Sequence, residues 1–375
     1  MPQYRSPAPH RRGALVMTLL VIGSVLLACT APASQPGGSA SAGRGPAPTA
    51  APPADVPTPE SPLRRVRVAY PQPSASQTPL WVAQEAGLFT RYGLEVDLQY
   101  VRTGNVLTRA LMAREVDIAA TGGNAVMEAI LQGIELVVIA SASNVLTFVI
   151  FSRPDLASLS DLLGRPVGLY SRGSLTETAL RVAFEVAALD ADRVEMVPLG
   201  GAPEVLAAMN TGVVAAGVLS APFTIVARQS GYRELLDVAT LNYPFLQGAI
   251  TTTRAFAAEQ PATVTAFLKG YLAGIKLARE DPEQAKRAIA RYTQTDAPDV
   301  LEESYRAYAP TWEPVPEVPE AAIRNVLRWL PTPGAANADP ARFKDDRFLR
   351  DLEASGFIRA LYPQGVDALR REPVP

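Results

Sequence analysis

The pattern of apolar and polar positions repeats itself once along this chain. Residues 110–120 (ALMAREVDIAA) read as the end of a helix, a turn and a short apolar strand, and residues 207–217 (AAMNTGVVAAG) repeat that order. Each copy is followed by small and polar residues, then by a helical pattern and another strand, at residues 136–140 and 235–239. A spacing of about a hundred residues is too long for a solenoid repeat. The pattern therefore predicts two similar α/β lobes.

Strands and helices alternate over most of the chain. Further strands are predicted over residues 66–70, 95–101, 117–120, 136–141, 147–151, 165–170, 194–198 and 247–252. From Pro261 onward the pattern is helical, over residues 264–280, 282–292, 298–308, 321–330 and 348–355. The alternation predicts a parallel sheet in each lobe. Open sheets of this kind bind ligands at the carboxyl ends of their strands, so a cleft between the lobes is expected there.

The amino terminus has the pattern of a secretory signal. Three arginines precede an apolar run over residues 14–28. That run is short for a membrane span, which needs roughly twenty residues, but it suits a signal peptide. It ends in Leu26-Leu27-Ala28-Cys29, which resembles a bacterial lipobox, and Cys29 is the only cysteine of the chain. We expect Cys29 to carry lipid; the alternative is an ordinary signal peptide with an accidental cysteine.

A low-complexity segment follows. Residues 30–62 are almost all Ala, Pro, Ser, Gly and Thr, a composition that cannot bury a core and that works as a tether. The chain is therefore expected to divide into a signal peptide (1–28), a tether (29–63), lobe one (64–153 with 246–375) and lobe two (154–245). The protein should lie outside the cytoplasmic membrane, attached by lipid, as a monomer.

Composition limits the chemistry that the mature part can perform. A hydrophobic content of 48% with 19% charged residues is that of a globular protein, and a net charge of −2 gives no basis for nucleic-acid binding. The single histidine, His10, lies in the predicted signal peptide. The mature part should then lack Cys–His and Ser–His–Asp centres and metal sites built on His or Cys. No catalytic residue, metal or cofactor is predicted.

Several phrases of the sequence resemble a known family. They are residues 79–89 (PLWVAQEAGLF), 92–96 (YGLEV), 115–119 (EVDIA), 156–168 (LASLSDLLGRPVG) and 345–348 (DDRF). In combination they resemble the solute-binding proteins of ABC importers for nitrate, alkanesulfonates, taurine and thiamine-pyrimidine precursors. The resemblance implies a two-lobed type II periplasmic-binding fold, with the helical C-terminal region packed on lobe one. It also implies a small organic or anionic ligand, delivered to a permease that an ATPase drives.

Two other functions stay open. One is an enzyme like the pyrimidine-precursor synthases of the same superfamily, which use a cysteine-rich motif and a histidine that the mature chain lacks. The other is an extracellular sensor that passes its ligand to a receptor. Binding without turnover is the expectation that agrees best with the composition.

The loops after equivalent strands are the expected lining of the cleft. The candidates are Ser74, Ser76, Gln77, Thr121, Gly122, Asn124, Ser143 and Asn144 in lobe one, and Arg172, Ser174, Ser220, Pro222 and Tyr243 in lobe two. Arg172 is the one cation among them and the sharpest candidate for an anion partner; the alternative is an arginine that faces solvent. Ser174 and Asn124 stand where a residue caps a helix, and the two roles can coincide, because a helix amino terminus favours anions. Tyr243 is a candidate for ring stacking.

Overall fold

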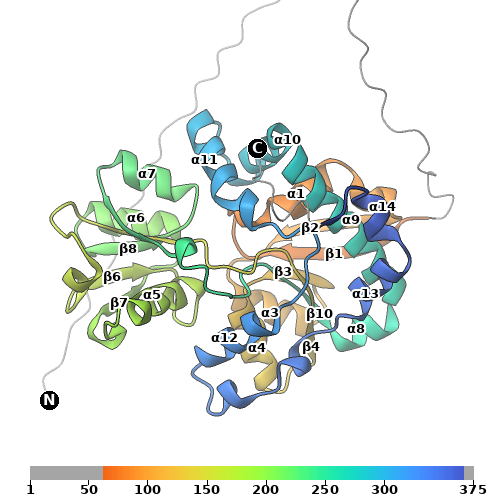
Figure 1. The fold of residues 1–375 in the computed structure, drawn as a ribbon, viewed down its shortest axis with the longest axis horizontal. Coiled ribbons are helices and arrows are strands. Elements are labelled where there is room, and N and C mark those ends of the chain that lie inside the picture. Colours follow the sequence, from red (N-terminus) through yellow and green to blue (C-terminus); the bar gives the residue numbers. More distant parts are fainter. Residues whose placement is uncertain (1–61, 367–375) are drawn as a thin grey trace, which may run out of the picture. The chain divides into compact units, whose positions relative to one another are not determined.

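The computed structural model describes residues 62–366. The predicted signal peptide, Cys29 and nearly all of the tether therefore lie outside the described residues. Within residues 62–366 the chain forms two five-stranded sheets with helices on their faces (Figure 1). This is the α/β architecture that the alternating pattern predicts.

The first sheet has the strand order β2-β1-β3-β10-β4, and the second has the order β7-β6-β8-β5-β9. The strands of the first sheet are β1 (Arg64–Tyr70), β2 (Leu94–Tyr100), β3 (Ile118–Thr121), β4 (Leu136–Ser141) and β10 (Ala249–Thr253). The strands of the second sheet are β5 (Val149–Ser152), β6 (Pro166–Leu169), β7 (Glu195–Pro198), β8 (Ala216–Leu219) and β9 (Arg233–Asp237).

The repeated sequence pattern marks equivalent places in the two sheets. Helix α3 (Gly104–Met112) leads into β3, and helix α6 (Ala202–Asn210) leads into β8. Both strands are third in the order of their sheet and pair in parallel with the second strand. Each is followed by a helix, α4 (Gly123–Leu131) or α7 (Phe223–Gln229). The prediction of two similar lobes is confirmed.

The prediction that both sheets are parallel is wrong for one strand in each. Strand β10 runs antiparallel to β3 and β4, and β5 runs antiparallel to β8 and β9. Two neighbouring strands run parallel when a helix on the face of the sheet carries the chain from the end of one strand to the start of the next. β5 and β10 are not preceded by such a crossover helix within their own lobe. Each enters its sheet directly from the other lobe, and so it runs in the opposite direction.

This topology also moves the boundary between the lobes. The sequence places residues up to 153 in lobe one, yet β5 pairs within the second sheet. The chain therefore crosses at residues 142–148, before β5, rather than at 148–154. It crosses back at residues 242–248, before β10. The two crossing segments run side by side: Phe245 N–H donates to the Asn144 carbonyl (2.8 Å), and Gly248 N–H donates to the Ser143 carbonyl (3.0 Å).

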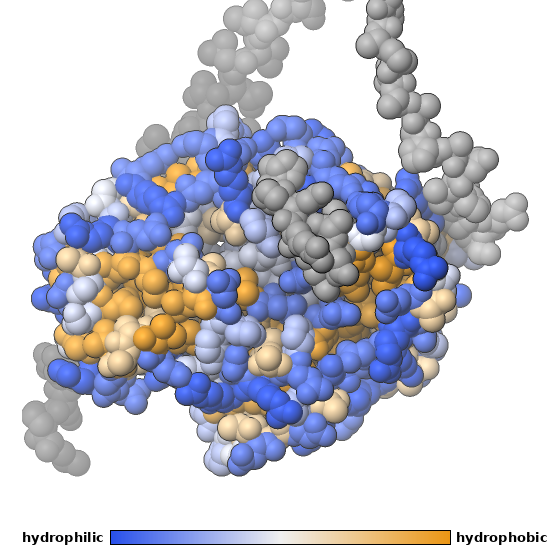
Figure 2. Space-filling view, viewed as in Figure 1, coloured by the Kyte–Doolittle hydropathy of each residue, from blue (hydrophilic) through white to orange (hydrophobic). Residues whose placement is uncertain are grey.

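The helical C-terminal region packs on lobe one, as expected. Helix α9 (Pro261–Glu280) lies against α1 (Thr78–Glu85) and α2 (Leu88–Arg91), and α10 (Pro282–Thr293) also lies against α1. Helix α12 (Glu320–Arg328) lies against α4, and α13 (Arg347–Ala354) contacts β4. The remaining helices of the described chain are α5 (Leu175–Val186), α8 (Arg254–Glu259), α11 (Pro298–Tyr308) and α14 (Phe357–Leu361). On the face shown in Figure 2, polar residues predominate over this region, and apolar residues gather over the lobe that contains the second sheet.

Close packing of α9 against α1 and α2 depends on two glycines. A Cβ atom on Gly270 would lie 2.5 Å from the Phe89 ring, and one on Gly274 would lie 2.5 Å from the Pro79 carbonyl oxygen. Trp81 and Phe89 are fully buried in the same core. Among the described helices none is both long and apolar enough to cross a membrane.

We expect Gly274→Ala to destabilise the protein although alanine favours helices. The added methyl group meets backbone, which cannot move aside, and overpacking of this kind costs about 1–3 kcal/mol. Thermal unfolding followed by circular dichroism measures the effect as a lower Tm. Glu280→Ala, an exposed change on the same helix, is the control and should leave Tm nearly unchanged. Equal Tm values for Gly274→Ala and the wild type would contradict the packing described.

Candidate functional site

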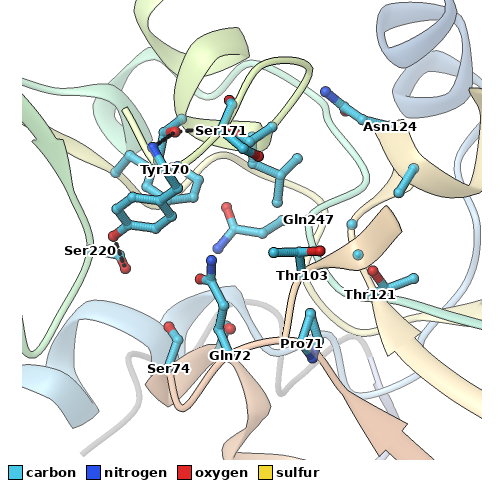
Figure 3. Close-up of a pocket in the computed structure, with 18 of the residues that line it drawn as sticks. Pro71, Gln72, Ser74, Thr103, Thr121, Asn124, Tyr170, Ser171, Ser220 and Gln247 are labelled. Atoms are coloured by element: carbon cyan, nitrogen blue, oxygen red, sulfur yellow. Dashed lines mark hydrogen bonds between the residues drawn. The ribbon is translucent and has the colours of Figure 1, made fainter. Parts of the chain in front are cut away.

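A cavity lies between the two sheets, where the carboxyl ends of their parallel strands face each other. We call it the inner chamber; it encloses about 850 Å³ of space, part of it open to solvent. Its lining comes from both lobes and from the crossing segments (Figure 3). The lining residues are Pro71, Gln72, Ser74, Ser76, Gln77, Thr103, Gly104, Asn105, Thr121, Gly122, Asn124, Ala125, Phe148, Tyr170, Ser171, Gly173, Ser174, Leu175, Thr176, Gly200, Ser220, Gln247 and Tyr308.

None of these lining residues is charged or is a histidine. Hydroxyl groups, carboxamides and aromatic rings supply the polar surface instead. Elsewhere in residues 62–366 no three His, Cys, Asp or Glu side chains gather as a metal site would require. The chamber can therefore offer hydrogen bonds and ring contacts, but no formal charge.

Three helices begin at the inner chamber. Helix α3 starts after Thr103, α4 starts after Gly122, and α5 starts after Ser174; in none of them does a side chain cap the first turn. Ser174 is in the capping position, but its hydroxyl donates to the Ser171 carbonyl (2.6 Å) and bonds to Thr176 Oγ1 (2.8 Å). Uncapped helix starts present N–H donors and a positive partial charge, and only the first N–H of α4, on Gly123, is already donated, to the Leu246 carbonyl (2.8 Å), among the contacts described for these starts. The chamber thus attracts electron-rich groups without using a cation.

Two buried polar groups at the chamber have no partner in the described part of the chain. They are Thr121 Oγ1 and Asn124 Oδ1, on residues that are 1% and 6% exposed. A buried polar atom without a hydrogen bond costs about 1–3 kcal/mol. Both atoms have under 1 Å² of accessible surface, so each is enclosed by protein in this arrangement of the chamber.

The floor of the chamber is a set of linked hydroxyl groups. Tyr308, at the end of α11, bonds to Ser74 Oγ (3.1 Å), and Tyr170 bonds to Ser220 Oγ (3.2 Å). Burial raises the pKa of both tyrosines above the ordinary value of 10. Both phenols therefore stay protonated at neutral pH and can donate to a ligand as well as accept from it.

Gln247 connects the chamber to the crossing segments. Its side-chain oxygen accepts from Thr147 N–H (2.7 Å), and its side-chain nitrogen donates to Thr147 Oγ1. Thr147 lies on one crossing segment and Gln247 on the other. Gln247 therefore both lines the inner chamber and hydrogen-bonds the two crossing segments to each other.

A second cavity continues the first toward the surface, and we call it the outer chamber. It encloses about 900 Å³, part of it open to solvent, and shares Gln72, Ser74, Thr103, Tyr170 and Ser220 with the inner chamber. Its own lining includes Tyr100, Pro222, Phe223 and the start of α6. At its edge Arg102 of lobe one forms an ion pair with Glu204 of lobe two (3.6 Å).

Side chains of the two lobes also meet around the cleft. Asn124 Nδ2 donates to Thr178 Oγ1 of α5 (2.8 Å), Arg328 of α12 pairs with Glu185 of α5 (2.8 Å), and Gln229 of α7 donates to Asp299 of α11 (2.7 Å). The structure therefore shows the lobes in contact across the cleft.

Eight of the thirteen candidates from the sequence line the inner chamber. They are Ser74, Ser76, Gln77, Thr121, Gly122, Asn124, Ser174 and Ser220. Pro222 lies on the outer chamber instead. The role of these residues in binding stays a prediction.

The other four candidates lie elsewhere. Ser143 and Asn144 belong to a crossing segment, where Ser143 donates to Thr311 (3.2 Å) and Asn144 donates to the Glu317 carbonyl (3.3 Å). Arg172 donates to the Met196 carbonyl (2.7 Å), lies near Glu177 and is not among the lining residues of the inner chamber. The Tyr243 hydroxyl accepts from Trp329 Nε1 (3.2 Å), away from both chambers.

Sequence reasoning missed several lining residues, chiefly Gln72, Thr103, Phe148, Tyr170, Gln247 and Tyr308. Gln72 and Tyr170 stand one or two residues from predicted loop positions, so a wider loop assignment would have included them. Tyr308 lies in a helical segment 234 residues from its partner Ser74, and no local pattern in the sequence indicates that contact.

Comparison with known proteins indicates a family. The model of the family described as NMT1/THI5 like matches residues 74–285, more than half of the chain. The riboflavin-binding protein RibY of Chloroflexus aurantiacus is 26% identical over 276 residues, covering 72% of this chain and 76% of that protein.

Solved structures of periplasmic binding proteins share the fold. The alkanesulfonate-binding protein SsuA from Xanthomonas axonopodis pv. citri, bound to MOPS, superposes with a TM-score of 0.60 at 18% identity over 72% of this chain and 91% of that one. The nitrate-binding protein NrtA from Synechocystis PCC 6803 gives a TM-score of 0.65 at 12% identity over 83% and 92%. The periplasmic-binding fold that the sequence resemblance implies is confirmed.

We expect ligand affinity to be constant from about pH 5 to about pH 9 for a solute that does not itself titrate. No lining residue of the inner chamber changes charge in that range, and the raised pKa values of Tyr170 and Tyr308 keep both phenols protonated. Calorimetric titrations across the range measure this, in buffers without sulfonates, because sulfonates are candidate ligands. A tenfold change in Kd across about pH 6–7 would show that a titrating group takes part in binding.

Proposed function

The chain belongs to the NMT1/THI5-like family, and on that premise we propose that it is a lipid-anchored, extracytoplasmic solute-binding protein. It captures a small organic or anionic metabolite between its lobes and delivers it to an ABC permease that an ATPase drives. Membership in the group of ABC-importer solute-binding proteins is supported by the family match, by the riboflavin-binding relative and by the structural neighbours.

The inner chamber is the observation that carries the proposal. It combines lining from both lobes with three uncapped helix starts in one cavity. A ligand held there contacts both lobes at once, so it stabilises the arrangement in which they meet. A permease can recognise that arrangement.

The same lining favours binding over chemical turnover. Nucleophilic catalysis by a hydroxyl group needs a base beside it, and the described lining of the inner chamber offers no His, Lys, Asp or Glu. The tyrosines are held in their protonated form by burial. The chamber therefore suits a protein that releases its ligand unchanged.

The energy of binding must come from many weak contributions. One helix start stabilises an anion by about 0.3–1 kcal/mol, or ~2 kcal/mol when partly buried, whereas micromolar affinity needs about −8 kcal/mol. Three helix starts, several carboxamides and ring contacts with Phe148 and Tyr170 together can supply it. The relatives named above bind riboflavin, an alkanesulfonate and nitrate, and these compounds are the first to be tested.

A thermal-shift screen against flavins, pyrimidines, sulfonates, nitrate and carboxylates tests the binding function. A ligand raises Tm in proportion to RT ln(1 + [L]/Kd). With the ligand found, Ser174→Ala should weaken binding by about 1 kcal/mol, close to fivefold, if its half-buried hydroxyl group forms one hydrogen bond to the ligand.

Ser143→Ala is the matched control for that variant. It also removes a hydroxyl group, but from a crossing segment outside the chamber, and it should leave Kd unchanged. A shift with divalent metals alone, or catalytic consumption of any compound that binds, would contradict the proposed function.

The lipid anchor requires a separate test, because Cys29 lies outside the described residues. We expect mass spectrometry of the membrane-extracted protein to find Cys29 as the first residue, with more than one acyl chain, since a single chain holds a protein only marginally. Cys29→Ala should release the protein from the membrane and leave its ligand affinity intact. An unmodified Cys29 in the wild-type protein would exclude the anchor.

A further inference from the structure

A further cavity lies at the opposite end of the first sheet from the two chambers, and we call it the basal groove. It is formed at the amino ends of β1 and β3 and the carboxyl end of β10, and it encloses about 1090 Å³ of space, part of it open to solvent. Its lining residues are Arg64, Arg65, Arg67, Leu111, Arg114, Val116, Asp117, Thr253, Phe256, Glu259, Gln260 and Thr263. None of them lines either chamber, so the proposed function leaves this cavity unused.

Two of the arginines of the basal groove have carboxylate partners. Arg67 donates to Asp117 through Nε (3.0 Å) and Nη2 (2.6 Å). Arg65 lies 4.0 Å from Glu95, but both side chains of this ion pair are more than half exposed, so the attraction is weak. Only the first pair neutralises its arginine.

The other two arginines of the groove, Arg64 and Arg114, keep their charge unpaired. Both residues are exposed, and their guanidinium groups have no acceptor or ion-pair partner among residues 62–366. Besides Asp117, Glu259 is the one carboxylate of the lining, and Glu115, next to Arg114 in the sequence, is not part of it. Positive charge is therefore in excess at the groove, which attracts anionic groups.

Arg114 is held in a backbone conformation that disfavours it. Its φ is 57°, in the left-handed region, four residues before β3 begins at Ile118. In the repeat of lobe two the corresponding position is Gly212, with a φ of 75°, four residues before β8 begins at Ala216. A residue with a Cβ atom is less stable in this conformation than glycine, so Arg114 costs stability that a glycine would not. Strained residues of this kind cluster at functional sites.

The predicted tether joins the fold at the basal groove. The described chain begins at residue 62, and Arg64 and Arg65 are the first residues of β1. A lipid on Cys29 therefore attaches the fold to the membrane by this edge of the sheet. Two exposed apolar residues, Leu63 (37%) and Met112 (50%), lie within two residues of the unpaired arginines in the sequence. Basic residues beside exposed apolar ones are the combination that binds an anionic membrane surface.

Resting on the lipid anchor of the proposed function, we propose that the basal groove is a docking surface for anionic phospholipids of the membrane that carries the protein. The guanidinium groups of Arg64, Arg65 and Arg114 bind the lipid phosphates, and Leu63 and Met112 enter the headgroup layer. Attachment keeps the membrane surface at a high local concentration, so contacts too weak to hold a free protein are sufficient. The chambers stay open to solute, because they share no residue with the groove.

The attraction to the membrane is local, because the mature chain as a whole is negative. The full chain has a net charge of −2, and residues 1–28 contain three arginines and no Lys, Asp or Glu. Removal of the signal peptide therefore makes the net charge more negative. Binding to anionic lipid then reports on a basic patch and not on the total charge.

Cys29, as the only cysteine of the chain, gives the experiment a defined attachment. The mature chain, residues 29–375 without acylation, is coupled through Cys29 to a maleimide lipid in vesicles of phosphatidylglycerol or of phosphatidylcholine. Modification with phenylglyoxal, followed by mass spectrometry, measures the accessibility of each arginine. We expect Arg64 and Arg114 to react at least about fivefold more slowly on phosphatidylglycerol, the effect expected for one arginine near an anionic surface. Arg193 and Arg233, exposed residues of lobe two, should react equally on both vesicles.

Two double variants test whether the arginines act as a cluster. In Arg64→Gln with Arg65→Gln, the protection of Arg114 on phosphatidylglycerol should fall by more than about half. Arg193→Gln with Arg233→Gln removes the same charge outside the groove and should leave the protection of Arg114 unchanged. The comparison of the two vesicles with the wild-type chain stands even if a variant fails to fold.

Several outcomes overturn the proposal. They are equal reactivity of Arg64 and Arg114 on the two vesicles, equal protection of the lobe-two controls, and protection of Arg114 that survives the loss of Arg64 and Arg65. Because the maleimide lipid supplies the attachment, failure of the docking surface leaves the anchor itself untouched. If the native protein carries no lipid on Cys29, the anchor is wrong, and with it the membrane as the occupant of the groove.

Discussion

Each sheet of this protein is completed by a strand that arrives from the other lobe, and the rest of the structure depends on that constraint. β5 and β10 each lie between the third and last strands of their sheet and run antiparallel to both neighbours. The sheet of each lobe is therefore completed only after the chain has crossed from the other lobe. The segments that lead into them are hydrogen-bonded to each other and joined by Gln247 and Thr147. The lobes are thereby connected at one edge, and the carboxyl ends of their parallel strands face a common cleft.

Recognition in this cleft relies on dipoles and neutral polar groups. Charged side chains occur at its edge and around the lobes, as in the pairs Arg102–Glu204 and Arg328–Glu185, where solvent screens them. Exposed ion pairs of this kind contribute little to stability, with a median of about 0–1 kcal/mol. They therefore add little free energy to the contact between the lobes. The interior uses helix starts and amides, which are strong where water is excluded.

Proteins with this fold have names that specify very different solutes, namely riboflavin, an alkanesulfonate and nitrate. The positions of the residues that line the inner chamber suggest why one fold can serve different solutes. Strands and helices of the core supply the frame, whereas most of the lining lies in loops at strand ends and helix starts. Loops can change without disturbing the packing of Trp81, Phe89 or Gly274 beneath them. Differences in ligand can therefore arise at a few positions at strand ends and helix starts while the core stays the same.

The sequence alone determined the elements, because apolar periodicity is a local property that burial on one face imposes. It located two similar lobes, predicted β4 at its exact bounds, and placed the C-terminal helices within a few residues. It also identified some of the lining at the ends of β3, β6 and β8, such as Thr121, Ser174 and Ser220, since a loop after a buried strand is recognisable without knowing its partners.

Only the tertiary structure decided which of these positions face one another. Arg172 stands in a loop of the right kind, but its neighbours direct it to the Met196 carbonyl. Ser143 and Asn144 follow a strand as the true lining residues do, yet they join the lobes, because β5 belongs to the second sheet. Tyr308 reaches Ser74 only through the packing of α11, and Asn124 Nδ2 donates to Thr178 and to the Gly173 carbonyl only because lobe two packs against the start of α4. Such contacts join residues that are distant in sequence, and no local pattern encodes them.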